Sequence, residues 1–246
     1  MYEALLHALA RKERAIEEEK LREREEFNRK FLYSHQWTYR ELDYFAKWKA
    51  KKMFPVGYNF QGQVDKIYQF VCCYFSEDEN GFNTLAGDLN VKNAKLTKGL
   101  MICGNVGVGK TSLMKLFSRN PRQCFEMVEA KRISDRFMKK GEEGIQPYME
   151  PWEYLSDDQE AFYQKFGGIC IDDMGTEELV NHFGNKRNVV GDVIEGRYSN
   201  TMCGPLLHAT TNLNREQMRS MYGDRVLSRL REIMNVVYFN GKDLRK

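Results

Sequence analysis

The 246-residue sequence lacks the features that mark membrane-spanning, secreted and zinc-binding proteins. No apolar run approaches the roughly 18 residues that a membrane-spanning helix needs, and the N-terminus has no basic segment followed by an apolar one, as a secretory signal would. The six cysteines include no C-x-x-C pair and no histidine at metal-ligand spacing, so buried, reduced thiols are expected rather than a zinc site. We therefore expect a cytoplasmic protein that does not contact a membrane.

The chain also lacks a strong excess of either charge. It has 38 lysines and arginines against 35 acidic residues, so net charge alone does not predict a nucleic-acid partner. Hydrophobic residues make up 42% of the chain, which is enough to build a sizeable core.

The first 79 residues are expected to form a helical, partner-binding N-terminal segment. Residues 1–30 are dense in Lys, Arg and Glu and contain no Gly or Pro, which predicts a long, mostly solvated helix, either a frayed tail or an arm that pairs with a partner helix. Thr38 and Glu41 have capping-box spacing and predict a helix to about Lys52, and apolar residues at three- and four-residue spacing predict a second over 64–75. The many aromatic residues of this segment either pack in a core or stack on single-stranded nucleic acid.

Residues 80–246 show the alternation of strands and helices that is typical of an α/β domain. Short apolar runs predict strands, and amphipathic segments between them predict helices; the strands are 99–103, 124–128, 168–171, 206–210 and 236–239, and the helices are 111–118, 133–140, 185–199, 215–221 and 225–231. We therefore expect a parallel sheet flanked by helices.

A complete phosphate-binding loop follows the first of these strands. The motif G-x-x-x-x-G-K-[ST] is met by Gly104, Asn105, Val106, Gly107, Val108, Gly109, Lys110 and Thr111, with Ser112 next in the helix. Glycines let the backbone wrap round phosphates, and the following helix presents its positive N-terminus to them. Lys110 is expected to reach the β- and γ-phosphates, and Thr111 to bind Mg²⁺ through its hydroxyl.

Two carboxylates end the strand about 60 residues later. Asp172 is expected to bind Mg²⁺, and Asp173 to orient and deprotonate the attacking water. ATPases of this type more often carry Glu at the second place, and the shorter Asp predicts slow turnover.

Polar residues at the end of the next strand and in the late helices complete the candidate site. Asn212 is expected to hold the lytic water or sense the γ-phosphate, the alternative being a turn or helix cap. Arg225 and Arg229 lie four residues apart on one helix face, and one of them, with Arg229 preferred, is expected to act as an arginine finger on a neighbouring subunit. The alternative is a solvated helix face.

Together these residues resemble the AAA+ ATPases of the bacterial helicase-loader group (DnaC/DnaI-like), which are similar to IstB-like transposition helpers. The matching stretches are GNVGVGKTSL, Asp172-Asp173-Met174-Gly175-Thr176-Glu177, Thr211-Asn212 and Tyr222-Gly223-Asp224-Arg225 with Ser228-Arg229-Leu230. The resemblance implies an AAA+ P-loop ATPase domain over 80–246, without the C-terminal helical lid of typical AAA+ proteins. It also implies ATP bound between subunits as a homo-oligomer, single-stranded DNA binding, and loading of a replicative DNA helicase contacted through residues 1–79.

Other functions share this ATPase core. A transposition helper would deliver a transposase to target DNA, and a nucleotide-dependent adaptor would hydrolyse little ATP because Asp173 replaces Glu. A small-molecule kinase is disfavoured by the strand end at Asn212 and by the late arginine pair. Hydrolysis, where it occurs, is expected to be slow and stimulated by DNA or by the partner.

Overall fold

The computed structural model describes residues 36–54, 57–58, 60–120, 122–149, 168–182, 185–199 and 207–240. The chain divides into two compact units, Met1–Gln36 and Trp37–Lys246. The helix expected over residues 1–30 lies outside the described residues. No helix within the described ranges is both long enough and apolar enough to cross a membrane.

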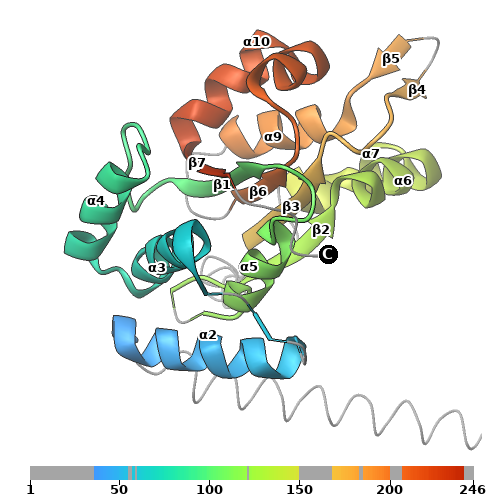
Figure 1. Cartoon of the computed structure of the whole chain (residues 1–246). Helices are drawn as coiled ribbons and strands as arrows, with labels where there is room; N and C mark the ends of the chain where they lie inside the picture. Colours follow the sequence, from blue (N-terminus) through green and yellow to red (C-terminus); the bar gives the residue numbers. More distant parts are fainter. Residues whose placement is uncertain are drawn as a thin grey trace, which may run out of the picture. The chain divides into compact units, whose positions relative to one another are not determined.

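The second unit contains helices and strands in the alternating order that the sequence predicts (Figure 1). The elements are α2 (Tyr39–Met53), α3 (Gly62–Ser76), α4 (Glu79–Asp88), β1 (Gly99–Gly104), α5 (Lys110–Phe117), β2 (Phe125–Glu129), α6 (Ala130–Lys140), α7 (Glu142–Met149), β3 (Gly168–Met174), β4 (Val180–His182), β5 (Asn185–Arg187), α9 (Val189–Ser199), β6 (Leu207–Thr211), α10 (Arg215–Ile233) and β7 (Met234–Phe239).

Five strands form one parallel sheet in the order β2-β3-β6-β1-β7. All five correspond to expected strands, so the predicted α/β fold with a helix-flanked parallel sheet is confirmed. β1 lies between β6 and β7, while the chain that leaves β1 crosses to the far edge and returns at β2. The chain therefore leaves β1 toward one edge of the sheet, and the last strand, β7, lies on the other side of β1. Parallel sheets bind ligands at the carboxyl ends of the strands where the strand order reverses in this way, which here is the end of β1.

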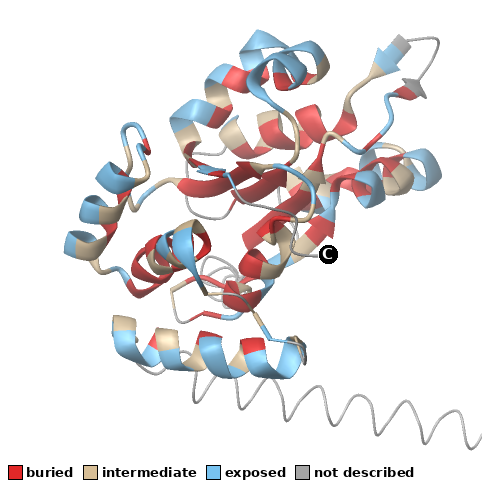
Figure 2. Cartoon of the chain, in the orientation of Figure 1, coloured by how far each residue is buried: buried red, intermediate tan, exposed pale blue. Residues whose placement is uncertain are grey.

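The two faces of the sheet pack against different helices. Along β1, Leu100 and Ile102 join a core with α2, α3, α4 and α5, whereas Met101 and Cys103 join a core with α6, α7, α9 and α10. Buried residues accordingly run through the strands and line the inner sides of both helical layers (Figure 2). This alternation is the period-two pattern of a sheet covered on both sides.

The N-terminal helices complete one of these faces. Among the described elements, those that connect β2 to β3, β3 to β6 and β6 to β7 pack in the second core, and α5 packs in the first. Helix α3 joins α5 in the first core and is buried along most of its length, with Tyr68, Tyr74 and Phe75 fully inside. Core packing is therefore confirmed for these rings, and the boundary expected at residues 79/80 falls inside the compact unit.

Helix α2 begins as the sequence predicts, with a reciprocal capping box between Thr38 and Glu41. It buries a narrow stripe of Leu42, Ala46 and Ala50. Lys49 extends from the same side to the C-terminal end of α5, where its ammonium donates to the carbonyl oxygens of Lys115 (2.6 Å) and Leu116 (3.1 Å). Burial lowers the pKa of Lys49 to about 8, and nearby Arg119 adds to the effect.

Several elements differ from the prediction. The segment 185–199, expected to be one helix, is divided between β5, which pairs with β4 in an antiparallel hairpin, and α9. By contrast, the two expected late helices are confirmed: they share the label α10, but the non-helical Gly223 (φ 78°, ψ 168°) separates them at the expected break. Helices α4 and α7 were not expected, because Gly or Pro interrupts their apolar periodicity. Five cysteines are buried and form no disulfide, as expected, and Cys203 lies outside the described residues.

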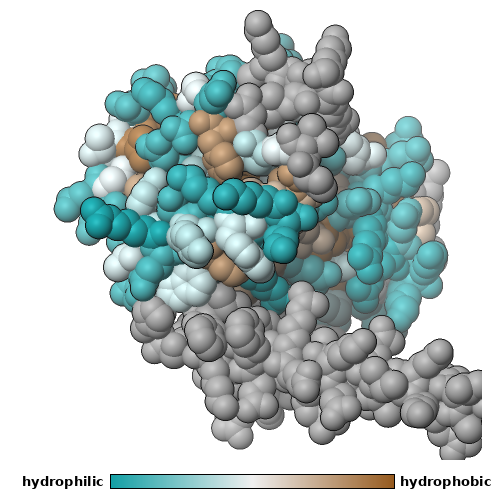
Figure 3. Space-filling model, turned by 60° about the horizontal axis from the view of Figure 1, so that its bottom comes forward, coloured by the Kyte–Doolittle hydropathy of each residue, from teal (hydrophilic) through white to brown (hydrophobic). Residues whose placement is uncertain are grey.

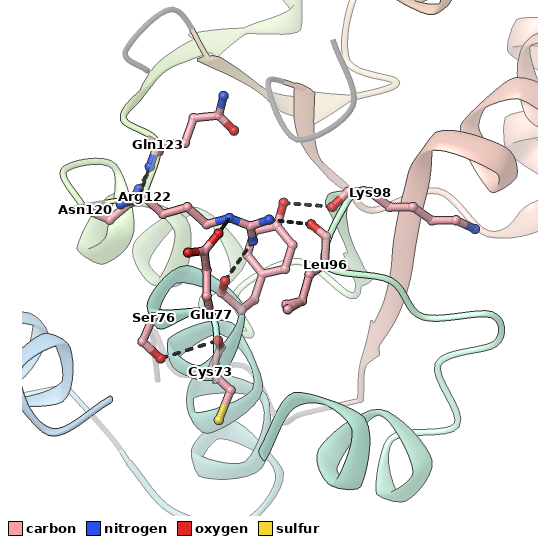
Figure 4. Close-up of polar contacts among 9 residues, drawn as sticks. Cys73, Ser76, Glu77, Leu96, Lys98, Asn120, Arg122 and Gln123 are labelled. Atoms are coloured by element: carbon pink, nitrogen blue, oxygen red, sulfur yellow. Dashed lines mark hydrogen bonds and ion pairs between the residues drawn. The ribbon is translucent and has the colours of Figure 1, made fainter. Parts of the chain in front are cut away.

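Arg122, between α5 and β2, fastens α3 to the sheet (Figure 4). Its guanidinium donates to the carbonyl oxygens of Tyr74 (2.9 Å) and Leu96 (2.7 Å), lies 4.6 Å from the Tyr74 ring centre, and pairs with Glu77 at 3.0 Å. The Tyr74 hydroxyl donates in turn to the Lys98 carbonyl oxygen, one residue before β1. A planar cation with several donors suits this place because it satisfies carbonyls from two segments at once.

Replacing Arg122 by Met is expected to lower the free energy of unfolding by about 2–4 kcal/mol, because two part-buried carbonyl groups lose a charged donor. Arg219→Met is the matched control: Arg219 pairs with Asp224 on the surface, where both side chains are mostly exposed, so a loss below about 1 kcal/mol is expected. Urea unfolding measures both, and equal losses would show that Arg122 does not fasten these segments.

Candidate active site

The phosphate-binding loop connects β1 to α5 at the carboxyl edge of the sheet. Gly107 (φ 82°) and Gly109 (φ 97°) adopt the left-handed conformation that turns successive N–H groups toward one side. Gly104 is required for a different reason: a Cβ there would lie 2.2 Å from the Phe239 carbonyl oxygen of the neighbouring strand. The glycines of the motif therefore serve both the loop conformation and the close pairing of β1 with β7.

The other loop residues divide between surface and core. Asn105 and Val106 are exposed at the tip, Val108 is fully buried and anchors the loop, and Ser112 is half-buried in the first turn of α5. The loop is thus fixed at its base and open at its tip.

The Lys110 ammonium lies inside this loop and is almost fully buried. It donates to the carbonyl oxygens of Gly104 and Asn105, each at 2.9 Å, and to Oδ1 of Asn212. Asn212 directly follows β6, so the structure brings the expected sensor residue to the expected phosphate-binding lysine, 102 residues away in the sequence. These three acceptors are neutral oxygens. An anionic phosphate oxygen would bind the ammonium more strongly and could replace them.

Asp172 is the buried carboxylate of the site. One of its oxygens, Oδ1, accepts from the Thr111 hydroxyl (2.9 Å) and from the Thr210 hydroxyl (2.6 Å). These hydroxyls come from α5 and β6, so one carboxylate joins three elements. The sequence predicts roles for Thr111 and Asp172 but none for Thr210. The contact of Thr210 with Asp172 depends on the register in which β6 pairs with β3, which the sequence does not give.

Asp173 lies in a distortion of β3. Its φ of 53° is left-handed, and the pairing of β3 with β6 shifts between Ile171 and Met174. The Thr210 hydroxyl also accepts the Asp173 backbone N–H at 2.9 Å, so the same side chain positions both acids. A bulge of this kind redirects a side chain from the sheet face toward the edge, and it leaves the Asp173 side chain half-exposed.

The loop after β3 is tied to α10 through a second buried carboxylate, Glu177. It accepts the Gly175 N–H at 2.8 Å and the hydroxyl of Tyr222, the residue immediately before the break at Gly223. Burial raises the pKa of Tyr222, and Glu177 raises it further, so this hydroxyl stays protonated and donates. The sequence marks both residues in the resemblance but gives no sign that they touch.

The two expected finger arginines lie beyond that break and share one partner, Glu195 of α9. Arg225 pairs with it at 3.1 Å and Arg229 at 2.8 Å. The Arg229 side chain is 17% exposed and its guanidinium lies 4.8 Å from the Tyr198 ring centre, whereas Arg225 is 73% exposed. Within the described residues the structure brings neither arginine into hydrogen-bond contact with the phosphate-binding loop of its own chain.

The residues present fit a magnesium ion with a triphosphate. A threonine hydroxyl beside a carboxylate offers hard oxygen ligands, and Mg²⁺ in such sites is completed by phosphate oxygens and water. The loop amides and Lys110 supply the positive field for the phosphates. The helix-flanked parallel sheet, with this loop at its carboxyl edge, is consistent with a P-loop NTPase fold.

Comparison with known proteins shows a likeness to a solved structure. Among solved structures, the chain is similar to the DnaC helicase loader, with a TM-score of 0.41 and 21% sequence identity over 65% of this chain and 89% of that one. No family model matches the sequence, and no curated protein matches it.

Replacing Thr210 by Val keeps its shape but removes the hydroxyl that serves both acids. We expect a loss of about 1–3 kcal/mol in the free energy of unfolding, because a buried carboxylate and a backbone N–H each lose a partner. Thr210→Ser keeps the hydroxyl and is expected to lose less. Urea unfolding of the two variants side by side tests this, and equal stabilities would mean that the hydroxyl does not hold Asp172 and Asp173.

Proposed function

We propose that the protein is an ATPase that acts with DNA, as a loader of a replicative helicase. The observation that carries the ATPase part is the convergence, at the end of β1, of Lys110 with Asn212 and of Thr111 with Asp172. Four side chains, from β3, the residue after β6 and the first turn of α5, thus meet at the phosphate-binding loop, which general packing does not explain.

In this proposal each residue has a distinct task. The amides of residues 105–111 and the Lys110 ammonium bind the β- and γ-phosphates and orient the terminal phosphorus for in-line attack. Thr111 and Asp172 would hold Mg²⁺, which supplies charge neutralisation on the phosphate oxygens when bound. Lys110 must then exchange at least part of its present contacts for phosphate oxygens.

Asp173 is the proposed general base, since its bulged backbone turns it toward the edge where phosphate would lie. It accepts the proton of the attacking water while Asn212 positions that water or contacts the γ-phosphate. A carboxylate one methylene shorter than Glu reaches less far, which supports slow turnover.

The shared-site part of the proposal concerns Arg225 and Arg229. A finger must leave its own chain and reach the phosphate of a neighbour in a homo-oligomer. Arg225 suits this better than Arg229, because Arg225 is exposed and Arg229 is packed on Tyr198. The geometry thus supports Arg225 as the finger and Arg229 as the group that holds Glu195.

The loader role rests on the resemblance of the Asp172–Glu177 and Tyr222–Leu230 stretches to helicase loaders. ATP as the nucleotide, single-stranded DNA as a ligand and a helicase contact through residues 1–79 come from the same resemblance. A transposition helper would carry the same ATPase core, and an adaptor with little hydrolysis would retain nucleotide binding without turnover.

The ATPase mechanism predicts that two variants fail in different ways. Lys110→Ala should weaken Mg·ATP binding about 10- to 100-fold, because a charged hydrogen-bond donor is lost. Asp173→Asn should bind nearly normally and lower kcat about 100-fold or more. Lys115→Ala, an exposed lysine on the same helix, is the control. Calorimetric titration and steady-state phosphate release measure these effects, and undiminished turnover in Asp173→Asn would exclude Asp173 as the base.

The loader role predicts ATP-dependent recovery of a replicative helicase. Full-length protein is required, because α3 shares a core with the sheet and residues 1–79 include only part of that core. Tagged wild type should retain the helicase of its own cell or phage with ATP present, and Lys110→Ala should change that retention. Recovery of a transposase instead would support the transposition helper, and a wild type that recovers no helicase with ATP would refute the loader role.

A further inference from the structure

An aromatic cavity on helix α2 lies apart from the phosphate-binding loop. It has a volume of about 600 Å³, and its described lining consists mostly of rings and lysine stems: Tyr44, Lys47, Trp48, Ala50, Lys51, Phe54, Gly57, Tyr58 and Phe60. None of these described lining residues is acidic. A cavity of this size accepts a small planar group.

Tyr44 and Trp48 are unusual in this protein because they are large rings left in solvent. Tyr44 is 76% exposed and Trp48 is 50% exposed, whereas the rings of α3 are buried. They lie four residues apart, so they occupy one side of α2, opposite the stripe that packs on the core. Figure 3 brings the underside of the molecule, where α2 lies, forward and shows strongly hydrophilic residues bordering paler and brown ones rather than a continuous apolar surface.

Trp48 is held in place before any ligand binds. Its ring stacks on Phe45 with centroids 5.9 Å apart and planes at 26°, and the edge of Trp37 meets Phe45 at 5.2 Å. One side of the indole is thus supported while half of its surface stays open. A supported ring loses little conformational entropy when a second planar group stacks on it.

The rings that line the cavity also pack on one another. Tyr58 contacts Phe54 and Phe60 at centroid distances of 5.5 and 4.7 Å, and its hydroxyl is buried without a hydrogen-bond partner among the described residues. These ring contacts hold the lining in place around the cavity.

Positive charge borders the rings. Lys51 and Lys52 are exposed at the end of α2, and Lys47, paired with Asp43 at 2.9 Å, lies one turn before Lys51. Rings that can stack on bases, bordered by lysines that can contact phosphates, are the combination by which proteins bind single strands without reading sequence.

We propose that this face of α2 is a binding site for single-stranded nucleic acid, with a base stacked on Trp48 and the backbone following Lys47 and Lys51. The choice of DNA as the strand rests on the proposed function. The assignment of the site to α2 rests on the exposed rings, the cavity beside them and the lysines.

The test is fluorescence anisotropy of the full chain with a labelled 20-nucleotide oligothymidylate at several salt concentrations. Leucine fills space without a π-face, so Trp48→Leu should raise Kd about 5- to 100-fold. Phenylalanine keeps an aromatic face, so the Kd of Trp48→Phe should stay within about threefold of wild type. Lys51→Ala should make the slope of log Kd against log salt shallower by about 0.7. Tyr238→Ala, an exposed ring on β7, is the control.

Equal affinities for the Leu and Phe variants would overturn the proposal, and circular dichroism of each variant excludes misfolding as the cause of a loss. Normal DNA affinity with lost helicase recovery in Trp48→Leu would assign this face to a protein partner and also overturn it. Mg·ATP titration is run in parallel. A wild type that binds ATP but no oligonucleotide refutes this site and leaves the ATPase proposal standing, whereas the reverse result refutes the ATPase and leaves the site.

Discussion

The burial of the Asp172 carboxylate is the constraint on which the rest of the site depends. A carboxylate taken out of water needs hydrogen-bond donors, and here two threonine hydroxyls supply them. Because these donors come from α5 and β6, satisfying Asp172 fixes the end of β3 against the first turn of the phosphate-binding helix and against the next strand. The Thr210 hydroxyl that serves Asp172 also accepts the Asp173 N–H, so the bulge in β3 follows from the same requirement.

A second constraint comes from the connections of the sheet. Among the described elements after β1, α5 packs on the face that α3 shares, and α6, α7, α9 and α10 pack on the other face. Helices α2, α3 and α4 add apolar surface to the first face, which buries that side of the sheet. The aromatic residues before β1 are therefore part of the fold that carries the phosphate-binding loop, and Arg122 holds them there through carbonyls on both sides of the junction.

The sequence predicts those features that depend on local chemistry. The phosphate-binding loop, the five strands and the Thr38 cap each depend on residues within a few positions of one another. What it could not predict depends on contacts between distant segments: Thr210 on Asp172, Tyr222 on Glu177, and the place of α3 in the core. The hairpin β4–β5 was missed because its three-residue strands are too short to show a period. The boundary expected at 79/80 follows a change in composition, whereas the shared core of α3 and β1 depends on contacts across that boundary.

The contacts of α5 differ between its two ends. Its first turn holds Lys110 and Thr111, and its last turn is capped by Lys49 of α2, whose ammonium meets the exposed carbonyls of that end. Burial lowers the pKa of Lys49 to about 8, whereas the contact with the α5 carbonyl oxygens favours its charged form. Because Lys49 extends from the side of α2 that packs on the core, this contact fixes α2 against the same helix that carries Lys110 and Thr111.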